Sequence, residues 1–169
     1  NKYFEKYLSI INHILEKNKK VILFTFYIGD DYLDQDLNQE LKKHAKFPDK
    51  VDIYNYNCNI FDTIEELKRC SYIVSMRLHG IIFSYILGIP FLSLGYDPKN
   101  KNFCDSINYP SEMSLDTSSL KDINLVLKSL DLMFTQNLSL FNNSMNREDA
   151  VAKVEKILSH LINSIKQKL

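Results

Sequence analysis

Hydrophobic positions at the start of the chain change from a helical spacing to a short continuous run. Four apolar side chains repeat at intervals of four, three and four residues with Lys and Glu between them, which predicts a helix over 2–17. They are Phe4, Leu8, Ile11 and Leu15. The run 21–26 that follows is β-branched and aromatic and too short for a helix, which indicates a strand buried on both faces.

Strands and helices continue to alternate along the rest of the chain. Further strands are predicted at 51–56, 71–75, 91–94 and 112–115, with a short segment at 102–107. Helices are predicted from the caps Asp30 and Asp31 to His44, at 63–69 behind the cap Asp62, at 78–87 before Gly88 and Pro90, and at 118–133. A long amphipathic helix, capped by Asn146 or Ser144, is predicted to end the sequence. This order implies right-handed βαβ units. We therefore expect residues 1–169 to form a single Rossmann-like α/β domain, with one parallel sheet and helices on both of its faces.

Composition and charge narrow the class of protein. Of the 169 residues, 45% are hydrophobic and 25% charged, with only 4 Gly and 4 Pro, which is typical of a globular domain and not of a disordered chain. Lys and Arg together number 21, as do Asp and Glu, so the formal net charge is zero. This balance removes the general electrostatic argument for a nucleic acid or an anionic membrane as partner. Any anion site must therefore be local.

Cysteine spacing and the length of the apolar runs exclude further classes. Cys58, Cys70 and Cys104 have neither the number of a disulfide framework nor the spacing of a zinc site, so we expect reduced thiols, a cytoplasmic location and no metal. No apolar run reaches the ~18 residues that a membrane-spanning helix needs. The sequence begins at Asn1 without Met, and we expect it to be part of a longer protein.

The end of the predicted strand 71–75 carries the strongest candidate for a binding site. Ligands of open parallel sheets bind outside the carboxyl ends of the strands, where loops lead into helix N-termini. Here Arg77, His79 and Gly80 fall in the first turn of an apolar helix, whose unpaired backbone N–H groups favour an anion. Arg77 can hold a carboxylate or a phosphate through two parallel hydrogen bonds, and His79 can act as an acid or a base. Gly80 lets a ligand or a neighbouring backbone approach closely.

A second loop on the same edge follows the predicted strand 91–94. It reads Gly-Tyr-Asp-Pro-Lys-Asn-Lys, and Tyr96, Asp97, Lys99 and Lys101 in it are candidate ligand contacts. Asp97 precedes a proline and is equally explained as a turn-forming residue. Lysines that follow a turn are usually solvated surface charges, and this explains both lysines without a ligand.

These two segments resemble the signature of the polysaccharide pyruvyl transferase family. Arg-Leu-His at 77–79, an apolar helix, Gly-Ile-Pro at 88–90 and Tyr-Asp-Pro-Lys at 96–99 follow the family's order and spacing, with the clear match over about 72–107. The resemblance implies a two-domain enzyme similar to the glycosyltransferase-B fold, of which this chain would be the C-terminal domain, without its N-terminal domain. It also implies transfer of a pyruvyl group from phosphoenolpyruvate to two hydroxyls of a sugar, which gives a cyclic ketal and phosphate.

The resemblance also implies a role for each residue of the motif. Arg77 would hold the carboxylate or phosphate of the donor, and His79 would be the general acid or base. The adjoining Leu78 and Gly80 and the loop at 96–101 would complete the donor site. Because phosphoenolpyruvate is a substrate, no cofactor is implied. The acceptor would be an envelope or exopolysaccharide glycan, free or lipid-linked, modified in the cytoplasm or at the inner face of the membrane, and this chain alone would be inactive.

Two other classes of protein stay open. Nucleotide-sugar glycosyltransferases and epimerases of the same architecture typically carry a Glu five residues before the Gly-x-Pro to bind a ribose. This chain has Phe83 there, and an apolar ring cannot accept hydrogen bonds from the ribose hydroxyls. A non-catalytic binding domain would instead have Arg77 and His79 occupied by internal carboxylates.

The remaining histidines and the tyrosines of the second strand have simpler explanations. His13, His44 and His160 lack ligand spacing, which indicates surface or packing residues. Tyr54 and Tyr56 end the strand predicted at 51–56, where packing in the core explains them as well as stacking on a sugar would.

Overall fold

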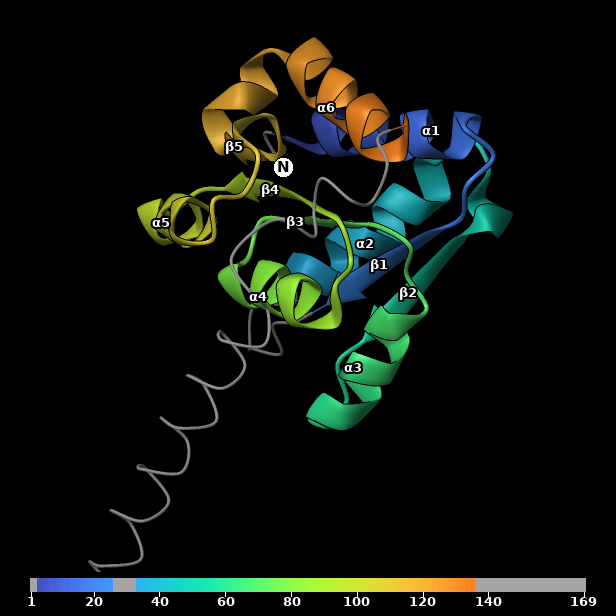
Figure 1. Ribbon diagram of the computed structural model, residues 1–169. Coiled ribbons are helices and arrows are strands. Elements are labelled where there is room, and N and C mark those ends of the chain that lie inside the picture. Colours follow the sequence, from blue (N-terminus) through green and yellow to red (C-terminus); the bar gives the residue numbers. More distant parts are fainter. Residues whose placement is uncertain (1–2, 26–32, 136–169) are drawn as a thin grey trace, which may run out of the picture. The chain divides into compact units, whose positions relative to one another are not determined.

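The computed structural model describes residues 3–25 and 33–135 (Figure 1). Contacts within the chain divide it into two compact units. Unit 1 contains residues 1–69 and 118–130, and unit 2 contains residues 70–117 and 131–169. The expectation of a single domain over 1–169 stays a prediction.

Unit 1 contains a pair of parallel strands with helices. Its elements are α1 (Phe4–Glu16), β1 (Val21–Thr25), α2 (Leu33–His44), the 3-10 turn Pro48–Lys50, β2 (Val51–Asn55) and α3 (Ile60–Lys68). The strands β1 and β2 pair in parallel from Val21 opposite Val51 to Thr25 opposite Asn55. Apolar side chains of α1, α2, β2 and the residue that follows α2 make the core of the unit, namely Ile11, Leu15, Leu41, Val51 and Ala45. The helix predicted at 2–17 and the strands predicted at 21–26 and 51–56 are confirmed to within two residues at either end.

The start of α3 differs from the prediction. Asn59, not Asp62, is its N-cap, because the side-chain oxygen of Asn59 accepts a hydrogen bond from the backbone N–H of Phe61 at 3.0 Å. Asp62 lies in the first turn and accepts a hydrogen bond from the side-chain amide of Asn57 at 2.7 Å. The predicted cap was wrong because Asn and Asp cap helices equally well, and two such residues lie close together here. The caps predicted at Asp30 and Asp31 fall outside the described residues.

Unit 2 contains a three-stranded parallel sheet. Its elements are β3 (Ile73–Ser75), α4 (Leu78–Leu87), β4 (Phe91–Gly95), α5 (Pro98–Ser106), the 3-10 turn Ser111–Met113 and β5 (Ser114–Asp116). The strand order is β3-β4-β5, with Ile73 opposite Phe91 and Ser93 opposite Ser114. The 3-10 turn Thr117–Lys121 and α6 (Ile123–Thr135) follow, and the division between the units crosses both.

Successive crossovers place α4 and α5 on the same face of this sheet. Both connections step one strand in the same direction and both are parallel, so right-handed crossovers put both helices on one side. The rings of Tyr85 on α4 and Phe103 on α5 meet edge to face, with their centroids 5.9 Å apart. Every residue of the central strand β4 is buried. The first turns of α4 and α5 therefore begin at the same edge of the sheet, the carboxyl edge.

Three predictions about the fold need correction. The strands pair as two parallel sheets in the described part of the chain, β1-β2 and β3-β4-β5, where the sequence predicts one. The segment predicted at 102–107 belongs to α5, which begins earlier, and the helix predicted at 118–133 is a 3-10 turn followed by α6. Apart from these corrections, α4 is buried only at Gly80, Ile81 and Ser84, because an apolar helix packed on one side of a sheet still exposes part of its circumference. The helix predicted after Asn146 lies outside the described residues.

Candidate functional site

The serine that ends β3 fixes the start of α4. Its Oγ accepts a hydrogen bond from the backbone N–H of Arg77 at 3.1 Å and donates one to the carbonyl of Arg77 at 2.9 Å. Arg77 is the N-cap of α4 in an extended conformation, and its side chain makes no capping hydrogen bond. Ser75 therefore determines where the backbone of Arg77 lies, while the guanidinium takes no part in capping the helix.

Gly80 is required by the close approach of Ser75. A Cβ built on Gly80 would overlap the Ser75 Oγ and lie 3.0 Å from the Ser75 Cβ. Gly80 is buried, and its carbonyl accepts a hydrogen bond from the hydroxyl of Ser84 at 2.6 Å. The sequence predicted that a ligand or a neighbouring backbone comes close to this glycine, whereas the close neighbour is the Ser75 side chain.

The predicted acid or base and the predicted anion ligand lie together in the first turn of α4. His79 is exposed and Arg77 is half-buried, with Leu78 half-buried between them. Within the described residues, no hydrogen bond and no ion pair engages the His79 ring. The first turn of α4 contains no acidic residue. The unpaired backbone N–H groups of a helix N-terminus favour an anion, and a cation there opposes the helix dipole.

The loop after β4 forms the start of α5. Asp97 is the N-cap of α5, Pro98 occupies the first turn, and the Asp97 carboxylate accepts a hydrogen bond from the backbone N–H of Lys99 at 2.9 Å. This N–H, together with the nearby Lys99 ammonium, holds the pKa of Asp97 below its ordinary value. The sequence left open a turn-forming residue or a ligand contact for Asp97, and in the structure Asp97 is the N-cap of a helix.

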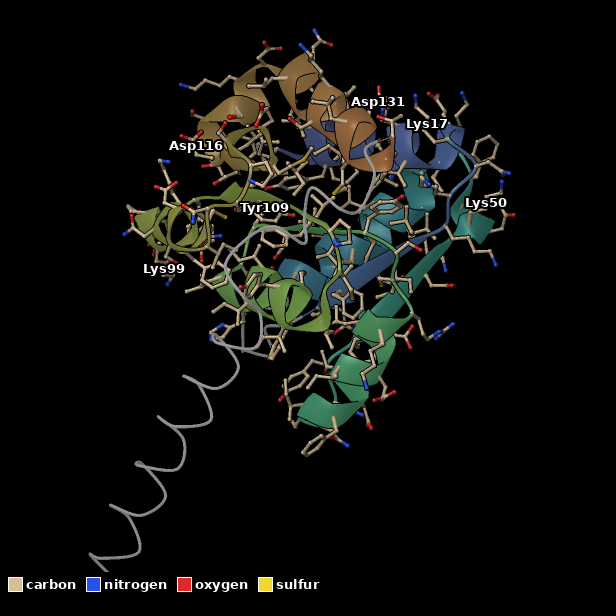
Figure 2. The ribbon with its side chains drawn as sticks, viewed as in Figure 1. Lys17, Lys50, Lys99, Tyr109, Asp116 and Asp131 are labelled. Atoms are coloured by element: carbon tan, nitrogen blue, oxygen red, sulfur yellow. The ribbon has the colours of Figure 1, made fainter. Side chains whose placement is uncertain are left out.

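The two lysines of this loop form ion pairs on α5. Lys99 Nζ lies 3.3 Å from the Asp97 carboxylate, and Lys101 Nζ lies 3.0 Å from that of Asp105 (Figure 2 labels Lys99). The lysine side chains are 56% and 71% exposed, so solvent screens both pairs and both ammonium groups can exchange partners readily. Tyr96, which directly follows β4, is 61% exposed. These side chains come from the same edge of the sheet as Arg77 and His79.

Sequence reasoning missed Asn100. Asn100 is 1% exposed and lies in the first turn of α5. Its side-chain amide donates a hydrogen bond of 3.0 Å to the carbonyl of Met76, which lies in the loop that leads into α4. An Asn between two lysines in a polar segment gave no signal of burial. The position of Asn100 depends on the Gly95 that ends β4, because a Cβ there would lie 2.5 Å from the Asn100 Cβ.

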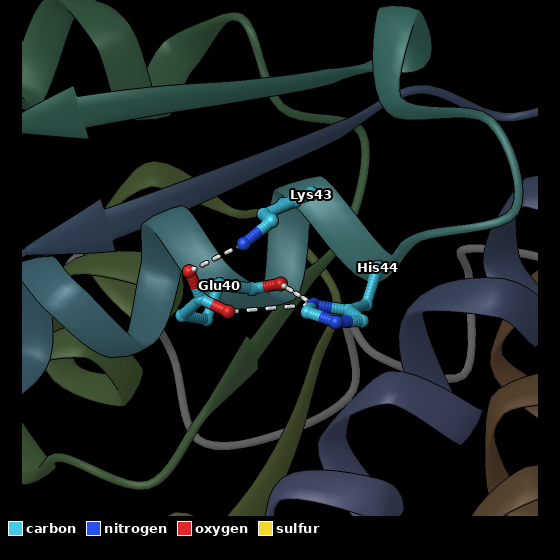
Figure 3. A network of polar contacts seen from close by, with 3 residues as sticks. All are labelled: Glu40, Lys43 and His44. Atoms are coloured by element: carbon cyan, nitrogen blue, oxygen red, sulfur yellow. Dashed lines mark hydrogen bonds and ion pairs between the residues drawn. The ribbon is translucent and has the colours of Figure 1, made fainter.

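The histidine of α2 has a structural role. His44 Nδ1 lies 2.9 Å from the backbone carbonyl of Glu40 and 3.6 Å from its carboxylate, and Lys43 pairs with the same carboxylate at 3.3 Å (Figure 3). The ring of Phe4 meets the imidazole edge to face at 5.6 Å.

Among the described residues no cluster of three or more His, Cys, Asp or Glu side chains could hold a metal ion, and no helix there is long and apolar enough to cross a membrane.

Fold and site together define an α/β protein with parallel sheets and a basic, histidine-bearing turn at the carboxyl edge of one sheet. The family model of polysaccharide pyruvyl transferase matches residues 1–98, more than half of the 169-residue chain. The chain belongs to the polysaccharide pyruvyl transferase family. No curated protein and no solved structure shows significant similarity to it.

The matched region covers part of the candidate site. It contains the Arg77–His79 turn, Gly80, Tyr96 and Asp97, whereas Lys99 and Lys101 lie beyond its end. The resemblance stated from the sequence is therefore confirmed, although the clear similarity expected up to about residue 107 extends past the matched residues.

Proposed function

We propose that this chain provides the donor site of a pyruvyl transferase. The enzyme would move the pyruvyl group of phosphoenolpyruvate to two hydroxyls of one sugar, forming a cyclic ketal and releasing phosphate. The chain would be the C-terminal domain of a two-domain enzyme acting in the cytoplasm on an envelope or exopolysaccharide glycan. The observation that carries the proposal is that Arg77 and the exposed His79 share the first turn of α4 in a member of this family.

The chemistry needs one fixed cation and one group that can transfer a proton. A proton added to the methylene carbon makes it a methyl group and leaves positive character at C2 of the donor. One sugar oxygen then bonds to C2, and the C2–O bond to the phosphate breaks. The second oxygen closes the ketal. The two sugar hydroxyls lose two protons. One replaces the proton that the methyl group gained, and the other leaves with the phosphate.

The residues of the α4 turn match these needs. Arg77 would bind the carboxylate or phosphate of the donor and keep C2 close to His79. His79, which no described residue engages, would supply the proton to the methylene carbon or remove one from the attacking hydroxyl. Leu78 would contribute its backbone, and Gly80 would act through its contact with Ser75. Tyr96, Asp97, Lys99 and Lys101 would border the donor from the start of α5.

A nucleotide-sugar enzyme remains the competing function. Phe83 lies half-buried in α4, where a ribose-binding Glu would be expected for that class. Thermal unfolding in the presence of each donor distinguishes the two functions. Phosphoenolpyruvate should raise the midpoint of thermal unfolding, and a nucleoside diphosphate sugar should not. A ligand at 100 times its Kd adds ~2.7 kcal/mol to the free energy of unfolding. Stabilisation by the nucleotide sugar alone would favour the competing function.

Two variants then test the roles. Arg77→Ala should weaken phosphoenolpyruvate binding at least about tenfold, since a charge-assisted hydrogen bond contributes ~1.5–3 kcal/mol. Arg69→Ala is the matched control, because Arg69 pairs with Glu66 on α3 and is 71% exposed. In the full-length enzyme, His79→Ala should leave donor binding intact and slow phosphate release in the presence of acceptor glycan by about 10²–10⁴-fold. Unchanged turnover in His79→Ala would contradict the assignment.

A further inference from the structure

The buried amide of Asn100 links the first turns of the two helices that carry the candidate site. Its Nδ2 donates to the carbonyl of Met76, the residue between the end of β3 and the N-cap Arg77. Asn100 itself belongs to α5, whose N-cap is Asp97. This one side chain thus fixes the distance between the turn with Arg77 and His79 and the turn with Asp97 and Lys99.

The space for this amide is built into the end of β4. A Cβ on Gly95 would lie 2.5 Å from the Asn100 Cβ and 2.9 Å from its Cγ, closer than side chains approach one another. Any other residue at 95 would displace Asn100 from Met76. The glycine and the asparagine therefore form one arrangement, with the asparagine two residues past the end of the family match.

The arrangement does not maximise stability. Asn100 is 1% exposed, and among the described residues its Oδ1 has no hydrogen-bond partner. A buried acceptor without a partner destabilises the fold. A Leu has nearly the same branched shape as Asn and no polar atom to leave unpaired. The part of the amide that the fold uses is therefore its N–H at Met76, and a buried group that lowers stability in this way is typical of functional sites.

We infer that Asn100 is a positioning residue, which holds the Met76 carbonyl so that Arg77 and His79 face a donor bound between the starts of α4 and α5. The inference rests on the proposed function for the identity of the donor. Asn100 itself would touch no substrate. Loss of its N–H would let the loop at 75–77 move while the sheet behind it stays in place.

The test uses Asn100→Leu in the intact protein, with Asn100→Ala as a second variant in case Leu does not fit. Asn102→Ala is the matched control, because Asn102 lies on the same helix and is exposed. Thermal unfolding measures stability, and hydrogen–deuterium exchange compares the amides of 76–80 with those of β4. Titration of phosphoenolpyruvate measures donor affinity.

We expect Asn100→Leu to unfold near the wild-type temperature, because removal of the unpartnered Oδ1 offsets the loss of the hydrogen bond to the half-buried Met76. The amides of 76–80, but not those of β4, should exchange faster, and phosphoenolpyruvate should bind about tenfold more weakly. Two results would overturn the inference. One is an equal increase of amide exchange in β4 and in 76–80; the other is a variant that binds phosphoenolpyruvate as tightly as a wild type that binds it. If the wild type does not bind phosphoenolpyruvate, the proposed function fails on its own. The exchange pattern then still decides whether Asn100 holds the loop.

Discussion

The hydroxyl of Tyr109 lies 2.8 Å from both the backbone N and the backbone O of Phe91, and the two rings stack with their centroids 3.9 Å apart. Phe91 begins β4, and β5 pairs with this strand only from Ser93 onward. The hydroxyl therefore takes the place of a neighbouring strand, accepting from the N–H of Phe91 and donating to its carbonyl.

Tyr109→Phe should destabilise unit 2 while keeping the stacked ring. The change leaves two buried backbone groups of Phe91 without their partner, at a cost of about 1–3 kcal/mol. The midpoint of thermal unfolding should fall by about 3–10 °C. Wild-type stability in this variant would show that water replaces the hydroxyl.

Burial also raises the pKa of Tyr109, so the unfolded chain ionises first and the contribution of this group to stability is lost as the pH rises above about 10.

Gly80→Ala should loosen the turn that carries Arg77. The added methyl group displaces the Ser75 Oγ, which otherwise holds the N–H and carbonyl of Arg77, and overpacking of this kind costs about 1–3 kcal/mol. Donor affinity should fall together with stability. The double variant with Ser75→Ala should be less destabilised than the sum of the single changes, because the atom that clashes is gone. Urea unfolding of the four proteins measures this coupling, and strict additivity would mean that the two residues do not interact.

The cap of α5 should depend on pH. The Lys99 backbone N–H holds the pKa of Asp97 below its ordinary value, so the charged cap stabilises the folded chain above the ordinary carboxyl range, about pH 4. That contribution disappears as the pH falls through the folded-state pKa. Asp97→Ala should therefore be less stable than the wild type at pH 7, and the difference should shrink in acid. Asp97→Asn keeps the accepting oxygen and is the control. A difference that stays constant down to pH 2 would contradict this role.

The lysines of α5 should affect binding more than folding. Their ion pairs are exposed, so Lys99→Ala and Lys101→Ala should change the unfolding midpoint by no more than about 2 °C. If the ammonium groups border the phosphate of the donor, either change should weaken phosphoenolpyruvate binding a few-fold, and the effect should shrink as salt is added. Lys68→Ala on α3 is the matched control, because its pair with Glu65 is also exposed. Equal affinities at low salt would remove both lysines from the donor site.

Local patterns predicted most elements of the fold, and they failed where a signal has two meanings. The helix expected at 78–87 is α4 with the same bounds, because the apolar run predicts a helix and Gly88, which adopts the left-handed conformation, ends it. The Asp97-Pro98 pair predicted a turn, yet the same two residues are the N-cap and first position of α5. Which strands pair was not predictable, because periodicity carries no information about partners distant in the chain.

The sequence predicted the ionisable residues of the candidate site but not the polar residues that hold them in place. Arg77 and His79 stand out in the sequence because a cation and an imidazole are unexpected at the start of an apolar helix. Ser75 and Asn100 do not stand out, since their roles depend on the missing Cβ atoms of Gly80 and Gly95. A glycine that makes room for a distant side chain cannot be told in one sequence from a glycine that makes a turn.

The parallel order of unit 2 also separates its two sets of connections. Every strand runs toward the edge with Arg77 and Asp97, so the returning segments at 88–90 and 108–110 enter the sheet at the opposite edge. Asn108 is exposed there, in a left-handed turn conformation. A fluorophore attached at this position would report on the sheet without obstructing an incoming ligand, which makes the far edge the natural place for labels and for tethering the protein to a surface.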